Sequence, residues 1–183
     1  MGKLAAAFAT DLPWVLAVVL TLVAGLSDLR SRRIPNRLTV PALLIGMAVN
    51  AGTGGWRGLL HSVEGAAIGL GLLLPVVLLR GLGAGDWKLM GALGSFVGPN
   101  KTIEILLISI FMAGGWGIVE MVRQRRVKAT LWNLWELVHG FVVFGLQPNP
   151  NISIDNRPLI KLPFGAVTAV ATAVALSATW LGR

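Results

Sequence analysis

Cysteine is absent from the 183 residues, and charged side chains are scarce. Without a thiol the sequence offers no disulfide, no zinc site built on cysteine and no cysteine nucleophile. Only 13% of the residues are charged, whereas 55% are hydrophobic, and the mean hydropathy is +0.73. Because the apolar residues also occur in long blocks, this composition excludes an ordinary soluble domain and indicates an integral membrane protein.

Lysine and arginine outnumber the acidic residues by 16 to 8, which gives a net charge of +8. The basic residues stand in short clusters beside apolar blocks. That pattern is typical of membrane topology rather than of a nucleic-acid-binding face, so we expect no nucleic-acid partner. The length fits a single membrane-embedded domain over residues 1–183.

Six apolar blocks predict an all-α polytopic membrane protein with about six transmembrane helices. The expected helices cover approximately residues 12–26, 36–50, 59–79, 86–97, 103–122 and 163–181. Glycine-rich or proline-containing stretches at 52–55 and 98–100 predict breaks between helices. We interpret the first block as a retained helix rather than a signal peptide, because a basic cluster follows it and no cleavage site does.

Residues 130–146 differ from the other apolar segments because polar side chains are interspersed among apolar ones at helical spacing. With Trp132 and Trp135 at headgroup level, this segment predicts an amphipathic helix on the cytoplasmic membrane surface. A seventh crossing is the alternative that the sequence leaves open.

The distribution of basic residues predicts the orientation of the helices. With six crossings, the loops after the first, third and fifth helices share one side and contain most of the lysines and arginines. The positive-inside rule makes that side cytoplasmic and places both termini outside. Asp28 and Asp86 then lie on the cytoplasmic side, near the ends of apolar blocks, where we expect a water-filled cavity.

The stretch Gly83-Ala84-Gly85-Asp86 places a carboxylate between two apolar blocks. An ionisable residue at membrane depth indicates a functional site, and the glycines allow the backbone to approach another segment closely. The alternative without chemistry is that Asp86 caps the helix that follows. For Asp28 the corresponding alternative is a surface ion pair with the arginines of residues 30–33.

Two carboxylates facing one cavity indicate aspartyl-protease chemistry. Two such groups at close range cannot both ionise easily, so the pair shares a proton. One member then activates water while the other protonates the carbonyl oxygen of the substrate. This chemistry needs no covalent intermediate, and we expect neither a metal nor another cofactor.

These residues resemble the signatures of the type IV prepilin leader peptidases. Asp28 together with residues 33–36, Arg-Ile-Pro-Asn, resembles the first signature. Residues 83–94, which begin Gly-Ala-Gly-Asp, resemble the second. Residues 162–166 resemble a third landmark at the entry to the last helix, although Ala166 stands where many members carry proline. Since paired cysteines are absent, the resemblance is to the short, protease-only branch of tight-adherence (Flp) pilus systems and implies no methyltransferase activity.

The resemblance implies a membrane endopeptidase that removes basic leader peptides from prepilins and pseudopilins at the cytoplasmic face of the bacterial inner membrane. The family's catalytic aspartates match Asp28 and Asp86, and which is acid and which is base stays open because a coupled pair titrates as a unit. Expected partners are the prepilin and membrane lipid. The supporting residues that we predict are Gly83, Gly85, Lys88 and Glu120 for the substrate or its loop, and Pro35, Asn36, Pro163 and Gly165 for structure.

Three local contacts are predicted as well. Asn36 is expected to cap the second helix, and Arg123 to pair with Glu120 three residues before it. Glycines at four-residue spacing, at positions 65 and 69 and at 94 and 98, predict close helix packing within the chain.

Three other functional classes remain open from the sequence. An ion- or proton-coupled carrier could use the same two aspartates. A presenilin-type intramembrane protease shares the Gly-x-Gly-Asp pattern. A non-catalytic assembly scaffold would tolerate the loss of both carboxylates.

Overall fold

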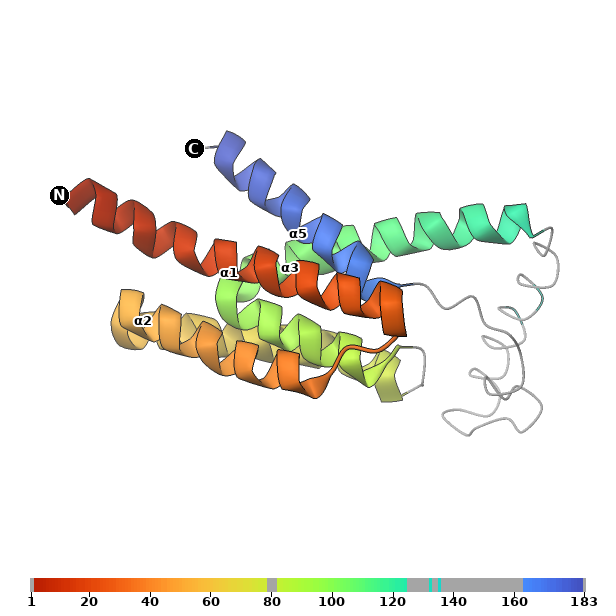
Figure 1. Ribbon diagram of the computed structural model, residues 1–183, viewed down its shortest axis with the longest axis horizontal. Helices are drawn as coiled ribbons and strands as arrows, with labels where there is room; N and C mark the ends of the chain where they lie inside the picture. Colours follow the sequence, from red (N-terminus) through yellow and green to blue (C-terminus); the bar gives the residue numbers. More distant parts are fainter. Residues whose placement is uncertain (1, 79–81, 125–131, 133–134, 136–162, 183) are drawn as a thin grey trace. The chain divides into compact units, whose positions relative to one another are not determined.

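The computed structural model describes residues 2–78, 82–124, 132, 135 and 163–182. Its long helices are α1 (Gly2–Ser31), α2 (Asn36–Leu78), α3 (Ala84–Arg123) and α5 (Phe164–Leu181) (Figure 1). The chain divides into two compact units, one of Met1–Met112 with Pro163–Arg183 and the other of Ala113–Leu162. The described residues contain helix and no strand, so the all-α class is confirmed.

Each of the four helices is long and apolar enough to cross a membrane. Two of them, α2 and α3, have 43 and 40 residues, about twice the roughly 20 that one crossing needs. Each of these two contains one residue with non-helical backbone, Gly55 (φ 58°, ψ −144°) and Gly98 (φ 77°, ψ −179°). The chain is a multi-pass membrane protein, and the described part gives four helices, two of them interrupted, without confirming six crossings.

Both predicted breaks are present, each at a single glycine. The break expected at residues 52–55 is shorter than the predicted loop, because helix continues to Gly54 and only Gly55 leaves the helical conformation. The break at residues 98–100 is confirmed at Gly98, whose positive φ suits glycine. Pro99 then stands at the start of the next helical run, where its missing N–H costs no hydrogen bond.

Other boundaries also move. The first helix is longer than residues 12–26 in both directions, and the run after Gly98 starts before the predicted residue 103. The predicted amphipathic helix at 130–146 lies outside the described residues except for Trp132 and Trp135, whose side chains are exposed.

The first half of α3, from Ala84 to the break at Gly98, packs closely against α2. Its residues 89–98 are all buried. A Cβ added to Gly65 of α2 would meet the carbonyl oxygen of Gly94 and would lie 2.7 Å from the Cα of Gly98; one added to Gly69 would lie 2.5 Å from the carbonyl oxygen of Met90. Backbones approach this closely only where side chains are missing, so the within-chain packing predicted from the paired glycines is confirmed.

Polar side chains from both halves of α2 hold the end of this segment. Asn50 Nδ2 donates to the carbonyl oxygens of Ser95 at 2.8 Å and Phe96 at 3.1 Å. Ser62 Oγ donates to the same Ser95 oxygen at 2.5 Å. Carbonyl groups just before Gly98 lack helical partners because the helix is interrupted there, and these side chains supply the missing donors.

The two helices α1 and α5 pack against each other (Figure 1). A Cβ added to Gly25 of α1 would lie 3.1 Å from the Cα of Ala166 and 3.2 Å from the carbonyl oxygen of Gly165. The missing side chain at Gly25 therefore brings the start of α5 next to the last turns of α1.

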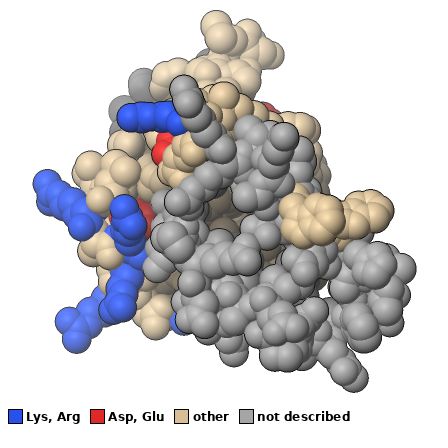
Figure 2. Space-filling model, turned by 90° about the vertical axis from the view of Figure 1, so that its right-hand side faces the viewer, with Lys and Arg blue, Asp and Glu red and all other residues tan. Residues whose placement is uncertain are grey.

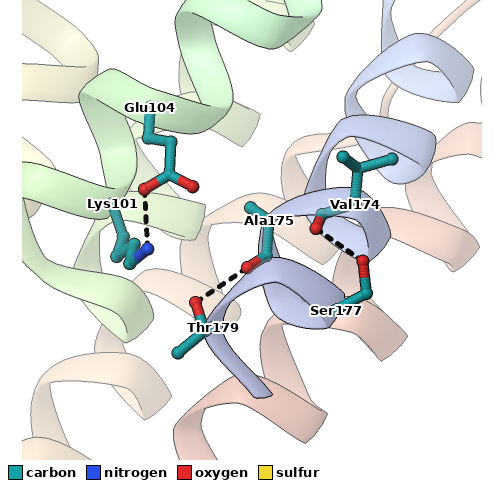
Figure 3. A network of polar contacts seen from close by, with 6 residues as sticks. All are labelled: Lys101, Glu104, Val174, Ala175, Ser177 and Thr179. Carbon is teal, nitrogen blue, oxygen red and sulfur yellow. Dashed lines mark hydrogen bonds and ion pairs between the residues drawn. The ribbon is translucent and has the colours of Figure 1, made fainter. Parts of the chain in front are cut away.

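Polar side chains in the middle of α3 and in the last turns of α5 find partners on their own helix, as Figure 3 shows. Lys101 Nζ and Glu104 Oε2 form an ion pair at 2.6 Å. Thr179 Oγ1 donates to the carbonyl oxygen of Ala175 at 2.7 Å, and Ser177 Oγ to that of Val174 at 2.8 Å. Such local bonding lets a polar residue stay in an apolar helix without a tertiary partner.

The packing of α2 against α3 predicts opposite effects of two alanine substitutions on the same helix. Gly65→Ala should lower the free energy of unfolding by about 1–3 kcal/mol, because its Cβ would collide with the backbone of α3. Gly71→Ala is the matched control, since nothing lies within 4 Å of its Cβ position. That control should gain about 0.5–1 kcal/mol from reduced backbone freedom. Thermal unfolding in detergent measures both, and equal stabilities would contradict the packing.

Candidate active site

Asp28 is a buried carboxylate near the end of α1, with 8% of its surface exposed. Its Oδ2 accepts a hydrogen bond of 3.0 Å from the backbone N–H of Gly165, the second residue of α5. A Cβ on Gly165 would lie 3.2 Å from the Cβ and from Oδ2 of Asp28, so glycine is what permits this approach. The surface ion pair with arginines 30–33 does not form among the described residues, although the charge of Arg32 acts on Asp28 at longer range.

The chain turns sharply after Asp28. The N–H of Arg32 donates to the carbonyl oxygen of Asp28 at 2.8 Å, and Arg32 takes a positive φ of 51°. Ser27 Oγ donates to the carbonyl oxygen of Arg33 at 3.0 Å, and the Ser31 hydroxyl is shared between the carbonyl oxygens of Ser27, at 2.8 Å, and Arg33, at 3.2 Å. These bonds fix the direction in which the chain leaves α1 and so determine where the next residues lie.

The link to α2 then begins a helix without the predicted cap. The carbonyl oxygen of Pro35 accepts the N–H groups of Leu38 at 3.0 Å and Thr39 at 3.4 Å. Asn36 is itself helical, and its Oδ1 accepts a bond of 3.0 Å from Lys88 Nζ. The capping role predicted for Asn36 is therefore wrong: its side chain joins the start of α2 to the start of α3.

Asp86 lies in the first turn of α3, at the third helical position after Gly83. The backbone N–H of Gly83 donates to its carboxylate, and the Gly83 carbonyl oxygen accepts the N–H of Trp87 at 3.2 Å. A side chain at this position that reaches back to the cap residue is half of a capping box. Asp86 therefore satisfies a helix-start donor, although not from the cap position that the sequence suggested. Trp87 Nε1 donates to the carbonyl oxygen of Leu70 at 2.6 Å, which fixes the rotation of this turn against α2.

Asp28 and Asp86 lie near each other, and Ile34 contacts the surroundings of both. A Cβ on Gly85 would lie 3.1 Å from the Cβ and from the carbonyl oxygen of Ile34, and one on Gly165 would lie 3.1 Å from its Cδ1. Ile34 thus contacts the residue before Asp86 and the residue that binds Asp28. The two carboxylates lie close enough to repel each other electrostatically. The structure brings together the two groups that the sequence singled out from distant parts of the chain.

Basic residues surround the link between α1 and α2. Figure 2 views the end of the molecule on the right of Figure 1 and shows lysine and arginine side chains gathered there. The exposed arginines of this link are Arg30, Arg32, Arg33 and Arg37. Among the described residues no three histidine, aspartate or glutamate side chains gather as a metal site.

Glu120 belongs to the unit of Ala113–Leu162. Its Oε1 accepts a hydrogen bond of 2.8 Å from Gln124 Nε2. The predicted pairing with Arg123 is wrong, since Gln124 one position further along is the residue that bonds Glu120.

Sequence reasoning missed two kinds of residue around Asp28. Ile34 was noted as part of a motif but not as the contact between the two aspartates. Ser27 and Ser31 were passed over because their partner, a backbone carbonyl, leaves no pattern in the sequence. Their positions four residues apart, in the last turn before a basic link, were the available signal.

A family model described as the type IV leader peptidase family matches residues 3–118, a range that includes both aspartates. The chain belongs to this family. It is 38% identical over 120 residues to the prepilin leader peptidase/N-methyltransferase of Escherichia coli (strain K12), covering 62% of this chain and 52% of that protein. It is 30% identical over 139 residues to the protein of the same name from Xanthomonas campestris pv. campestris, covering 71% and 48%.

The protein of the same name from Neisseria gonorrhoeae is 32% identical over 126 residues, covering 64% of this chain and 42% of that protein. The chain thus spans about half the length of the curated relatives it matches. No solved structure matches it.

The bond between Gly165 and Asp28 predicts how substitutions at Asp28 rank in stability. Asp28→Ala leaves a buried N–H without an acceptor and should lower the free energy of unfolding by about 1–3 kcal/mol relative to Asp28→Asn. Asp28→Asn keeps a side-chain oxygen as acceptor while it removes the charge. Thermal unfolding of the two variants in detergent compares them, and an alanine variant as stable as the asparagine variant would contradict the bond.

Proposed function

We propose that this chain is a membrane aspartyl endopeptidase that removes leader peptides from prepilins or pseudopilins, with Asp28 and Asp86 as its catalytic residues. The observation that carries the proposal is the convergence of two carboxylates from α1 and α3, both inside the range matched by the family. The names of the similar proteins supply the substrate class.

The surroundings of the two carboxylates suit a shared proton. Asp28 is buried and holds one backbone donor, from Gly165, while Asp86 is partly exposed and holds another, from Gly83. Backbone N–H groups stabilise a carboxylate without neutralising it, so each group can be either ionised or protonated during the reaction. Repulsion between the two favours one proton on the pair.

In the proposed reaction, the ionised carboxylate takes a proton from a water molecule whose oxygen attacks the carbonyl carbon of the scissile peptide bond. The protonated carboxyl group donates its proton to the carbonyl oxygen, which gives a neutral tetrahedral intermediate. The intermediate collapses when one of its hydroxyl groups returns a proton to the carboxylate that had protonated the carbonyl oxygen, the C–N bond breaks, and the leaving nitrogen receives the proton first taken from water. The pair then again holds one proton, and the products are the leader and the mature protein.

The proposed topology has six crossings, because Gly55 and Gly98 each interrupt a helix about twice the length of one crossing. The exposed arginines beside Asp28 favour the cytoplasmic side of the inner membrane for this end of the molecule. We also propose that residues 1–183 act as one peptidase domain.

Single Asp28→Asn and Asp86→Asn variants should each lose at least about 10³-fold in cleavage rate, because either change removes the group that moves a proton. The measurement is the gel shift of a co-purified prepilin in proteoliposomes. Glu104→Gln is the control, since it removes a carboxylate paired with Lys101 and should leave cleavage unchanged.

Cleavage that persists in both aspartate variants would overturn the mechanism. Loss of substrate or ion uptake with normal cleavage would favour a carrier instead, and unchanged function in both variants would favour a scaffold.

A proton shared by two carboxylates also predicts a bell-shaped dependence of kcat/KM on pH, since both the fully protonated and fully ionised pairs are inactive. Initial cleavage rates across a pH series measure it. A rate that rises to a plateau with a single inflection would indicate one titrating group and contradict the pair.

The sequence prediction that no methyl group is transferred stays a prediction, and it concerns an activity that the relatives' names include. Mass spectrometry of the mature N-terminus, with S-adenosylmethionine present, tests it. We expect the mass of the cleaved, unmethylated product; an added methyl group would refute the protease-only assignment.

A further inference from the structure

Ile34 occupies a position between the two aspartates that no sequence pattern assigned to it. It is buried, although it sits in a link whose arginines are exposed. Its Cβ and backbone lie against Gly85, and its Cδ1 lies against Gly165. Each of these glycines is next to, or bonded to, one of the two aspartates.

We infer that Ile34 is a positioning residue that sets the separation between the Asp28 and Asp86 carboxylates by filling the space between the starts of α3 and α5. The effect on spacing stands on the geometry alone, whereas its effect on cleavage rests on the proposed function.

The contacts on the two sides of Ile34 differ in kind. On the α3 side, the approach involves its Cβ, carbonyl oxygen and N, at 3.1 to 3.4 Å from the Cβ position of Gly85, so this side is fixed by backbone. On the α5 side, it involves the end of the side chain, at 3.1 Å from the Cβ position of Gly165. The length of the side chain therefore decides how far α5 stands from α3 here.

A β-branched side chain suits this role because its χ1 rotamer is restricted. Close-packed interiors also transmit changes in volume to their neighbours rather than absorbing them. Shortening residue 34 should let Gly165 and the bound Asp28 carboxylate move towards Asp86. A smaller separation strengthens the interaction between the two carboxylates, since Coulomb energy rises as distance falls.

Two cations near this site must stay unchanged in the test, one of which acts on the pair directly. Arg32 acts on Asp28, and Lys88 is held by Asn36 at the start of α2. The apolar side chain of Ile34 forms neither a hydrogen bond nor an ion pair with these groups, so substitutions at 34 leave both in place.

The separation can be measured without substrate, because the chain has no native cysteine. Single cysteines replace Leu29 and Ala84, two exposed residues next to or near the aspartates, and carry nitroxide spin labels. In this background Ile34→Ala should shorten the label-to-label distance in the dipolar EPR spectrum. Ile34→Val, which loses a single methyl group, should shorten it less, and Ile34→Leu, of equal volume, should keep it.

Two control variants separate a local effect from general loosening. Ile105→Ala empties a fully buried site in the part of α3 after Gly98, and Ile45→Ala shortens an exposed side chain on α2. Neither should change the label distance. An unchanged distance in Ile34→Ala, or an equal change in Ile105→Ala, overturns the inference whether or not the chain cleaves a prepilin.

The same Ile34 variants, without labels, then test the consequence for cleavage. Ile34→Ala should reduce kcat by about 10-fold or more, with KM little changed, because misplacing a reacting group by a fraction of an ångström to 1 Å is costly. The two limbs of its pH profile should also move apart, which a merely destabilised protein would not show. A shortened distance with an unchanged pH profile would reject the link to catalysis while the spacing role stands; an inactive parent enzyme would reject the proposed function alone.

Discussion

Contact between the backbones of α2 and α3 is the constraint on which the position of Asp86 depends. Gly65 and Gly69 carry no side chain, so the first half of α3 lies directly on α2. The indole of Trp87 donates to the carbonyl oxygen of Leu70 in the second half of α2. The ammonium group of Lys88 donates to Asn36 at the start of the same helix. The position of the Asp86 carboxylate follows from this arrangement, because Asp86 lies in the helical turn that these contacts orient.

A membrane protein has to satisfy its polar groups internally, and here that requirement coincides with the needs of the acidic pair. In apolar surroundings a buried N–H without a partner is costly. The N–H of Gly165, in the first turn of α5, has no partner within its own helix. The carboxylate of Asp28 is its acceptor. One hydrogen bond therefore completes a helix terminus and holds an aspartate in place.

The parts of the fold that obey local rules were predictable. Gly98 before Pro99 has few conformational options, and the break was found there. Gly52 and Gly54 can remain helical because nothing nearby forces another conformation, so the break is confined to Gly55 instead of extending over the predicted four-residue loop. Two aspartates at membrane depth were visible as anomalies of charge.

Contacts between distant parts of the chain could not be predicted. The capping role of Asn36 was inferred from its neighbours in the sequence, whereas its partner is 52 residues away. Asn50 and Ser62 were missed for the same reason: their acceptor lies on another helix, and a single polar residue in an apolar block has no periodic signal.

The bond between Asp28 and Gly165 joins residues 137 positions apart. Ribosomes add roughly 5–20 residues per second, so the first aspartate enters the membrane roughly 7–30 seconds before its backbone donor has been made. In the later part of that interval, once Asp86 and Gly83 have been made, the nascent chain holds both aspartates but only one of their two backbone donors. The order of synthesis therefore leaves the Asp28 carboxylate without its backbone donor until the start of α5 has been made.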